Sequence, residues 1–136
     1  MDDRQQNAIL VIDDDPGALA AIQAALEVSD YRVYTAKSGD EGIKLYETHW
    51  QEIKLVLLDY MMPEMTGDLV LEWLRMVNPD VRVLLVTGYG DVFVRKMLAL
   101  RVCGYLKKPF TVSDLVQCVQ DALDAPVVPA SIRSYR

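Results

Sequence analysis

Short apolar runs recur along the chain and alternate with longer stretches of helical periodicity, and this alternation restricts the fold more than any other feature. Runs that are apolar at nearly every position are typical of strands buried on both faces. When such strands alternate with helices, right-handed crossovers place them in a parallel sheet with helices on both faces. The runs that predict strands are Ala8–Ile12, the more polar Arg32–Ala36, Lys54–Leu58, Val81–Val86 and Cys103–Leu106.

Helices are predicted in the intervening stretches, from start signals and from apolar residues at helical spacing. Asp15–Pro16 combines an N-cap residue with a proline at the first helical position. Ser38 is expected to cap the second helix in a capping box with Glu41. Three further helices are expected: one through Leu69–Val77, one near Val92–Arg101 and one over Ser113–Leu123. The supporting apolar positions are Leu19, Ile22, Ala25 and Leu26; Ile43, Leu45 and Tyr46; Leu69, Leu71, Trp73, Leu74 and Val77; and Leu115, Val119 and Leu123.

The number of strands predicts the topology. A five-stranded parallel sheet with helices on both faces usually has the strand order 2-1-3-4-5, the flavodoxin-like doubly wound (βα)5 arrangement. The length of 136 residues is typical of one domain, which we expect over residues 8–124. The polar segment 1–7 is expected to be an N-terminal tail, and the proline-rich segment 125–136 a C-terminal tail or linker.

Composition excludes several classes of function. The net charge of -6 argues against direct nucleic-acid binding, because a duplex binder needs a basic surface. No apolar run approaches the roughly 18 residues that a membrane span needs, and the polar N-terminus lacks a signal segment. The two cysteines are too few for a disulfide framework. These features predict a cytoplasmic protein without membrane contact.

Polar residues of related chemistry follow four of the predicted strands. Asp13 and Asp14 follow the first strand, Asp59 the third, Thr87 the fourth and Lys108 the fifth. In open α/β sheets, ligands bind beyond the carboxyl ends of the strands where the strand order reverses. The order 2-1-3-4-5 makes the first and third strands neighbours at that point. We therefore expect the three carboxylates to converge.

Three converging carboxylates repel one another, and a divalent cation removes that repulsion. Oxygen ligands without histidine or cysteine favour magnesium or manganese. Lys108 adds a positive charge and Thr87 a hydroxyl donor, which together suit a phosphoryl group bound near the metal. Asp13 and Asp14 suffice to attract the metal, whereas Asp59 can act as a nucleophile that forms an acyl phosphate.

Neighbouring residues have simpler interpretations. Asp15 is expected to cap a helix rather than bind a ligand. Met61, Met62 and Met65 are expected to fill the core rather than form a partner surface. A strand-end aspartate taken alone is more often a cap or turn residue than a ligand, so the site prediction depends on the agreement of four strand ends.

Four segments together resemble the receiver (CheY-like) domain of two-component response regulators: Leu10–Asp15, Leu57–Gly67, Val86–Gly88 and Gly104–Phe110. They occur in the family's order, each follows a strand, and the resemblance extends over about Ala8–Leu123. It implies a phosphoacceptor signalling domain in which Asp59 receives a phosphoryl group from the phosphohistidine of a histidine kinase or a histidine phosphotransfer domain.

The resemblance also implies a role for each site residue. Asp14 and Asp59 would bind Mg²⁺ directly, Asp13 would bind it through water, and Met61 would bind it through its backbone carbonyl. The phosphoryl oxygens would contact Thr87, Gly88 and Lys108. Tyr105 would turn inward when Thr87 moves towards the phosphoryl group, and the Lys108–Pro109 peptide bond would be cis.

The same resemblance implies an output surface. The face built from the helix at Val92–Arg101 together with Cys103–Leu123 is expected to bind a downstream protein, an effector domain or a second copy of the chain.

The positions that flank the site, Met61 and Tyr89, carry neither charge nor amide. We therefore expect slow autodephosphorylation, and the resemblance implies no enzymatic activity beyond this reaction and the domain's own phosphorylation.

Two other functions compete with this interpretation. Asp13–Asp15 also resembles the Asp-x-Asp motif of haloacid-dehalogenase-type phosphatases, which use magnesium and an aspartyl phosphate. That motif continues to Thr or Val where this chain has Gly17, and it leaves Asp59 unexplained. The second alternative is a phosphorylation-independent interaction module on the same fold, against which the acidic residues, Thr87 and Lys108 argue.

Overall fold

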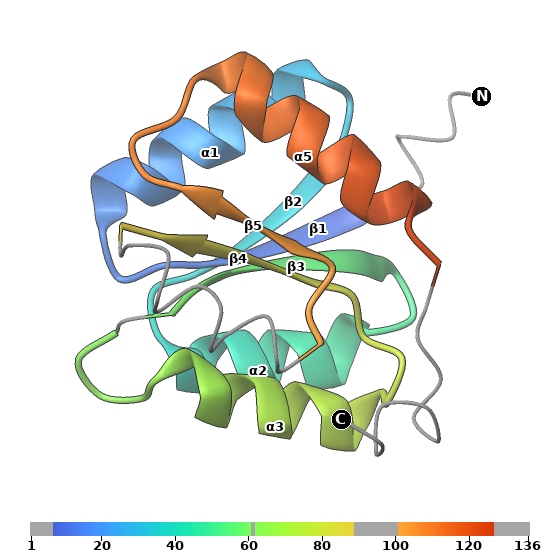
Figure 1. Ribbon diagram of the computed structural model, residues 1–136. Helices are drawn as coiled ribbons and strands as arrows, with labels where there is room; N and C mark the ends of the chain where they lie inside the picture. Colours follow the sequence, from blue (N-terminus) through green and yellow to red (C-terminus); the bar gives the residue numbers. More distant parts are fainter. Residues whose placement is uncertain (1–6, 61, 89–100, 127–136) are drawn as a thin grey trace.

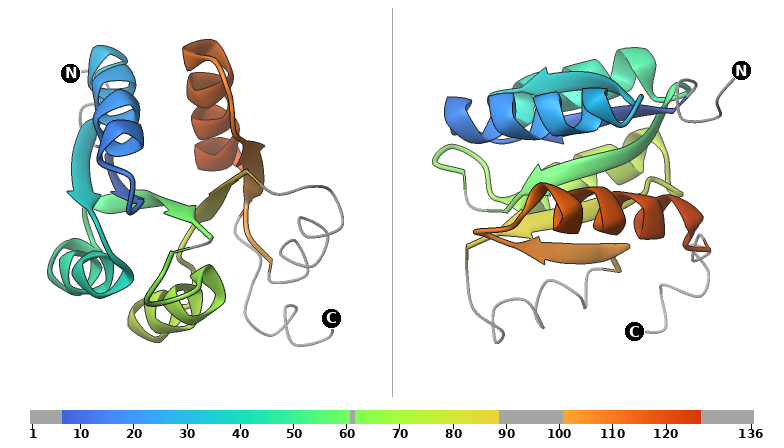
Figure 2. Two further views of the ribbon diagram at one scale, coloured as in Figure 1. Left: turned by 90° about the vertical axis from the view of Figure 1, so that its left-hand side faces the viewer. Right: turned by 90° about the horizontal axis from the view of Figure 1, so that it is seen from above.

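The computed structural model describes residues 7–60, 62–88 and 101–126. Five parallel strands form one sheet in the order β2-β1-β3-β4-β5, as the sequence predicts. Their bounds are β1 Ala8–Ile12, β2 Arg32–Ala36, β3 Ile53–Asp59, β4 Val83–Thr87 and β5 Gly104–Lys107. Helices α1 (Pro16–Val28) and α5 (Val112–Asp124) cover one face, and α2 (Gly39–His49) and α3 (Gly67–Val77) cover the other (Figures 1 and 2). The helix expected at Val92–Arg101 lies almost wholly outside the described residues.

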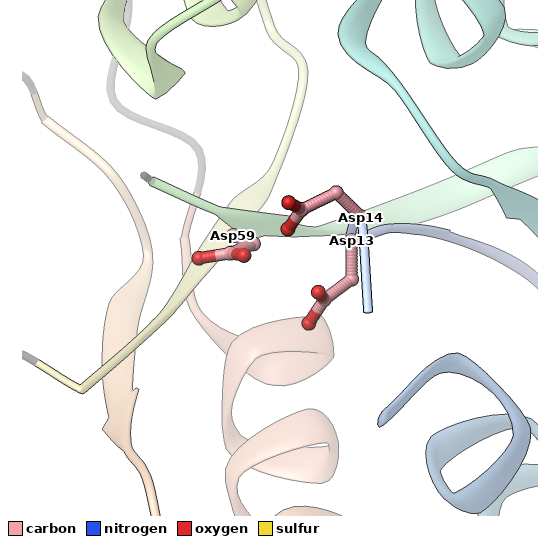
Figure 3. Close-up of side chains that lie close together, drawn as sticks. All are labelled: Asp13, Asp14 and Asp59. Carbon is pink, nitrogen blue, oxygen red and sulfur yellow. The ribbon is translucent and has the colours of Figure 1, made fainter. Parts of the chain in front are cut away.

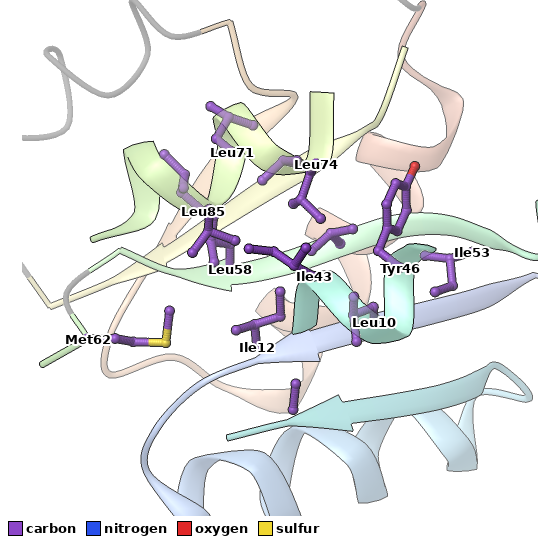
Figure 4. Close-up of a cluster of buried hydrophobic side chains, with 14 of the residues drawn as sticks. Leu10, Ile12, Ile43, Tyr46, Ile53, Leu58, Met62, Leu71, Leu74 and Leu85 are labelled. Atoms are coloured by element: carbon purple, nitrogen blue, oxygen red, sulfur yellow. The ribbon is translucent and has the colours of Figure 1, made fainter. Parts of the chain in front are cut away.

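Alternation along the strands divides the core between the two faces of the sheet. On the α2–α3 side, Leu10, Leu58 and Leu85 pack with residues such as Tyr46 and Leu74 (Figure 4). On the α1–α5 side, the intervening strand residues pack against the helices: Ile9, Val11, Leu55, Leu57, Leu84 and Val86 contact Leu19, Ile22, Leu26, Leu115 and Val119. Each fully buried aliphatic side chain contributes about 1.5–3 kcal/mol. The central strands therefore hold their carboxyl ends in a fixed position.

Helix starts agree with the sequence in kind but differ in detail. Asp15 caps α1 by accepting from the Gly17 N–H at 3.0 Å, as predicted. Ser38 caps α2 through the Glu41 N–H at 3.2 Å, but the Glu41 carboxylate accepts from Lys37 N–H and not from Ser38. The capping box predicted there is therefore incomplete. A complete one opens α5, which begins at Val112 rather than Ser113.

In that capping box, Thr111 and Asp114 each accept from the backbone N–H of the other. Thr111 is not among the predicted caps, because the helix is expected from the sequence to begin two residues later, at Ser113. Earlier in the chain, the buried face of α3 agrees only in part with the apolar positions expected from the sequence. Val70, Leu71 and Leu74 are buried, but Leu69 and Trp73 are about half exposed.

Strand bounds shift by one or two residues from those predicted. β3 extends one residue at each end, so that Asp59 is its last residue. β4 begins at Val83 instead of Val81, because the Val81 N–H donates to the Asn78 carbonyl and closes a turn. β5 begins at Gly104. Just before it, the Cys103 N–H donates a hydrogen bond to the Val83 carbonyl at 2.8 Å. None of the helices in the described ranges is long and apolar enough to cross a membrane.

Candidate functional site

The register of β1 and β3 brings the predicted carboxylates together. Ile12 at the end of β1 pairs with Leu58 of β3, so the next residues, Asp13 and Asp59, lie side by side at the sheet edge. Carboxylate oxygens of Asp13, Asp14 and Asp59 all lie within 4.8 Å of one another. Figure 3 shows the three side chains converging from the two strands. The predicted convergence is therefore present in the structure.

Asp13 is held by three contacts and is only 1% exposed. Its backbone N–H donates to the Ala36 carbonyl at 3.1 Å, which ties it to the end of β2. One carboxylate oxygen, Oδ1, accepts from the Asp15 N–H at 2.9 Å, and the other, Oδ2, accepts from Lys108 Nζ at 2.8 Å. Asp13 thus has little freedom to move, whereas Asp14 is exposed.

Lys108 provides the positive charge of the site. Burial by itself lowers the pKa of its ammonium group, but the hydrogen bond that it donates to Asp13 and the charges of Asp13, Asp59 and Asp15 outweigh that effect. The net result is a raised pKa, so Lys108 stays protonated at neutral pH. The predicted charge is present beside the carboxylates, and its contact is with Asp13.

Thr87 and Lys108 reach the site from neighbouring strands. Thr87 is the last residue of β4, is 1% exposed, and pairs with Lys107 of β5. Its carbonyl accepts from the Lys108 N–H at 2.8 Å, which joins the two residues through the backbone. Gly88 follows on the exposed surface, where a Cβ would meet no atom within 4 Å among the described residues other than its chain neighbours. The carboxyl ends of β1, β3, β4 and β5 therefore all contribute to one site.

Other predicted residues lie as follows. Tyr105 is 37% exposed, so its ring faces outward in this structure. The Lys108–Pro109 peptide bond is cis, as the resemblance implies. Met62 is buried in the core and Met65 packs against it, which confirms the simpler interpretation of both. Met61, the proposed carbonyl ligand, lies outside the described residues.

Sequence reasoning missed two features of the site. The contact between Lys108 and Asp13 joins residues 95 positions apart, and no local pattern signals it. The second feature is a close approach of Gly67 to Tyr60, where the Gly67 N–H donates to the Tyr60 carbonyl at 2.7 Å. Gly67 belongs to the motif after the third strand, so a signal was available, but its packing cannot be deduced from sequence.

The arrangement combines hard anionic oxygen ligands, a fixed ammonium group and a hydroxyl-bearing residue at one edge of the sheet. Such a set can bind a divalent cation together with a phosphoryl group, and it places a carboxylate beside both. A cavity of about 150 Å³ opens next to Asp14, between Lys37–Gly39 and Met62–Met65. The carboxylate cluster is therefore reachable from solvent on that side.

Comparisons with known proteins agree with this chemistry. A family model described as the response regulator receiver domain matches residues 9–120. The chain is 35% identical over 117 residues to the sensor kinase CckA of Brucella abortus (strain 2308), covering 85% of this chain and 12% of that protein. It is 35% identical over 104 residues to the alkaline phosphatase synthesis transcriptional regulatory protein PhoP of Bacillus subtilis (strain 168), covering 76% and 42%.

A solved structure, a response regulator receiver domain protein from Clostridium thermocellum, is 32% identical to this chain. It superposes with a TM-score of 0.79, over 87% of this chain and 94% of that one. The chain thus matches the solved receiver over nearly its whole length, but it spans less than half the length of the two curated relatives. The fold, the order of the motifs and the carboxylate site all agree with these matches, and the chain belongs to the receiver domain family of two-component response regulators.

Proposed function

We propose that Asp59 is the phosphoacceptor of this receiver domain and that its phosphoryl group comes from a protein phosphohistidine. The observation that supports this most strongly is the convergence of Asp13, Asp14 and Asp59 within 4.8 Å, beside the Lys108 ammonium group. Asp59 ends β3 and is half-buried, so its carboxylate is both positioned and accessible. Receiver domains are signalling domains that act with sensor kinases and effector domains.

The transfer step requires one bond to form and one to break. An Asp59 carboxylate oxygen attacks phosphorus, the bond between phosphorus and the donor's imidazole nitrogen breaks, and that nitrogen keeps the electron pair. The product on this chain is an acyl phosphate. Lys108 and Thr87 lie at the ends of β5 and β4, from which they would hold phosphoryl oxygens. The Lys108 ammonium group would then interact with both Asp13 and the new phosphoryl group.

The acidic cluster has the composition of a metal site typical of receiver domains, and we propose that it binds a divalent cation. Its donors are all carboxylate oxygens, which fits Mg²⁺, with Mn²⁺ as an alternative. Asp14 and Asp59 would bind the ion directly, and Asp13, already engaged by Lys108, would bind it through water. The bound ion would neutralise the carboxylates and the incoming phosphoryl oxygens. The role of the Met61 carbonyl stays part of this proposal.

The donor protein must border the site, because the imidazole nitrogen has to approach Asp59 to bonding distance. A groove of about 340 Å³ lies directly beside Lys108, between α1 and the start of α5. It is lined by Ala18, Ala21, Ile22, Ala25, Pro109, Phe110, Val112 and Leu115. The alanines leave room for a helix to pack closely. We propose that the histidine-bearing helix of the donor binds in this groove.

We also propose how the rest of the chain is divided between the receiver domain and its flanking segments. Residues 8–124 form the receiver, segment 1–7 is a tail, and segment 125–136 is a tail or a linker to another part of a longer protein. The output surface includes β5 and α5. Catalysis is limited to the domain's own phosphorylation and its slow reversal, since the chain adds no charged or amide residue at positions 61 and 89.

A mass measurement tests the central proposal. The chain is incubated with Mg²⁺ and a small acyl phosphate, and the intact mass is recorded for the unmodified chain and for Asp59→Asn. One phosphoryl adduct is expected on the unmodified chain and none on the variant. Asp121→Asn, an exposed aspartate on α5, serves as the matched control and should keep the adduct. An undiminished adduct on Asp59→Asn would show that the acceptor is another residue.

The mass measurement, together with a turnover assay on a generic phosphate ester, distinguishes the receiver role from the two alternatives. A haloacid-dehalogenase-type phosphatase would release phosphate from a generic ester substrate in many turnovers, whereas one adduct per chain without turnover supports the receiver role. An interaction module that does not depend on phosphorylation would acquire no adduct at all. The family match and the position of Asp59 within the cluster both favour the receiver role.

A further inference from the structure

The loop that follows Asp59 is closed by a short backbone hydrogen bond. Gly67, the first residue of α3, is buried, and its N–H donates to the Tyr60 carbonyl at 2.7 Å. Tyr60 is the residue directly after the proposed phosphoacceptor. This hydrogen bond therefore joins the two ends of the segment 60–67 immediately beside Asp59.

No side chain fits at position 67. A Cβ atom there would lie 2.8 Å from Tyr60 Cδ2 and 2.9 Å from Tyr60 Cα. The ring of Tyr60 could rotate, but its Cα belongs to the backbone and can move only with the chain. Gly39 is crowded in a different way, because the atoms nearest to its Cβ position belong to the side chains of Val70 and Met65.

Both sides of the contact are anchored. Asp59 pairs with Val86 in the β3–β4 ladder, which fixes the strand up to the site. On the other side, Val70 and Leu71 in the first turns of α3 are buried in the core, at 0% and 2% exposure. Close-packed interiors yield little to an added methyl group. An added Cβ would therefore displace Tyr60, which is linked to Asp59 by a peptide bond.

We propose that Gly67 is a positioning residue for Asp59, and that the absence of a side chain there sets where the Asp59 carboxylate lies relative to Asp13 and Asp14. The inference rests on the proposed function, because it assumes that Asp59 is both acceptor and metal ligand. It assigns to Gly67 a role in metal affinity and phosphorylation rate, and not only in stability.

The test compares Gly67→Ala with Gly104→Ala. Gly104 begins β5 at the opposite edge of the sheet, and a Cβ there would meet Leu84 at an ordinary 3.6 Å. Unfolding midpoint, Mg²⁺ dissociation constant and rate of phosphorylation by an acyl phosphate are measured for the 136-residue chain. Gly67→Ala should weaken Mg²⁺ binding and slow phosphorylation by about 10- to 100-fold, the range for residues that orient metal ligands. Gly104→Ala should leave both unchanged.

A double variant separates displacement of the backbone from loss of packing. Tyr60→Ala removes the ring that Gly67→Ala would strike but leaves the Cα at 2.9 Å. With both substitutions, Mg²⁺ affinity should stay below that of Tyr60→Ala alone. If affinity and rate return to those of Tyr60→Ala, or if folded Gly67→Ala already matches the unmodified chain, the positioning role is wrong.

An exchange measurement on the unmodified chain covers the case in which Gly67→Ala does not fold. Mg²⁺ should increase the protection of the Gly67 amide from hydrogen exchange more than that of the Asn78 amide, which donates to Leu74 at the far end of α3. Equal changes at the two amides would overturn the inference. If the unmodified chain acquires no phosphoryl adduct, by contrast, the proposed function is wrong. The Mg²⁺ affinities of the variants would still test whether Gly67 positions the carboxylates.

Discussion

Asp13 and Asp14 are adjacent in sequence, but they have different surroundings because successive residues at a strand end point to opposite sides. Asp13 is buried and paired with Lys108, whereas Asp14 is exposed beside the open cavity. A buried carboxylate already neutralised by an ammonium group attracts a cation less than an exposed one does. The structure therefore favours Asp14 as a direct ligand and Asp15 as a helix cap.

This division of roles predicts different effects of two alanine substitutions. Asp14→Ala should weaken Mg²⁺ binding by about 10- to 100-fold or more. That is the loss typical of residues that only support a metal ligand, and Asp14 is proposed to be a ligand itself. Asp15→Ala should cost about 1 kcal/mol of stability through the lost cap and leave Mg²⁺ affinity unchanged, because Asp13 accepts from the backbone N–H of residue 15. Isothermal titration and chemical unfolding measure the two effects. Equal losses of Mg²⁺ affinity in the two variants would refute the assignment.

The raised pKa of Lys108 predicts a pH dependence of stability. Because the folded state favours the protonated ammonium, this contribution to the free energy of unfolding is full below the unfolded pKa of 10.5 and is lost as pH rises through the higher folded pKa. Lys108→Met removes it, and the exposed Lys107→Met is the matched control. The stability difference between unmodified chain and Lys108→Met should shrink at alkaline pH. A difference independent of pH would contradict the prediction.

Individual site residues could be predicted from sequence because each lies at, or just after, the carboxyl end of a strand. Asp13, Asp14, Asp59, Thr87 and Lys108 all reach the same sheet edge once the strand order is known. Their pairing could not be predicted in the same way. Which carboxylate Lys108 contacts depends on the path of the chain after β5 and on the burial of Asp13, and both are tertiary properties.

At the scale of elements, the pattern of apolar runs predicts the strands well because nearly every position in β1, β3 and β4 is buried. Helix faces are less certain. In α3, Leu69 and Trp73 have helical spacing, as do Val70, Leu71 and Leu74, and the sequence alone does not decide which set faces the core. The structure buries the second set. Helix ends depend on which of two nearby hydroxyl groups bonds the backbone, as Thr111 does at α5.

If the donor protein binds in the groove between α1 and α5, a substitution in the groove should slow phosphoryl transfer from a protein donor but not from a small-molecule donor. Ala21→Glu places a charge in the apolar groove, whereas the exposed Ala20 on the same helix does not line it. Ala21→Glu should slow transfer from a phosphohistidine protein and leave phosphorylation by a small acyl phosphate unchanged, because the Asp59 site is intact. Ala20→Glu should affect neither. The docking proposal fails if both Ala21→Glu rates fall together or neither changes.

At the scale of the whole molecule, signalling requires two conformations, one of which phosphorylation stabilises relative to the other. The described structure has the features of one such state. Thr87 is buried at the end of β4, and Tyr105, which pairs with Leu85 on the neighbouring strand, has its ring exposed. We propose, as the family resemblance implies, that a phosphoryl group on Asp59 draws the Thr87 hydroxyl towards it and frees space into which the Tyr105 ring can turn.

This coupling predicts that a change in the site spreads to the face formed by β5 and α5. Beryllofluoride with Mg²⁺, which mimics the phosphoryl group, should shift amide NMR signals in Gly104–Lys107 and Val112–Asp124 as well as in the site loops. Thr87→Ala should still accept a phosphoryl group on Asp59, because the carboxylate cluster does not include Thr87. The distant shifts should nevertheless shrink, since Ala cannot hydrogen-bond the mimic. Thr111→Ala, a loss of a helix cap, controls for general destabilisation and should keep them. If the shifts never extend beyond the site loops in the unmodified chain, or persist undiminished in Thr87→Ala, Thr87 does not link the phosphoacceptor to the output face.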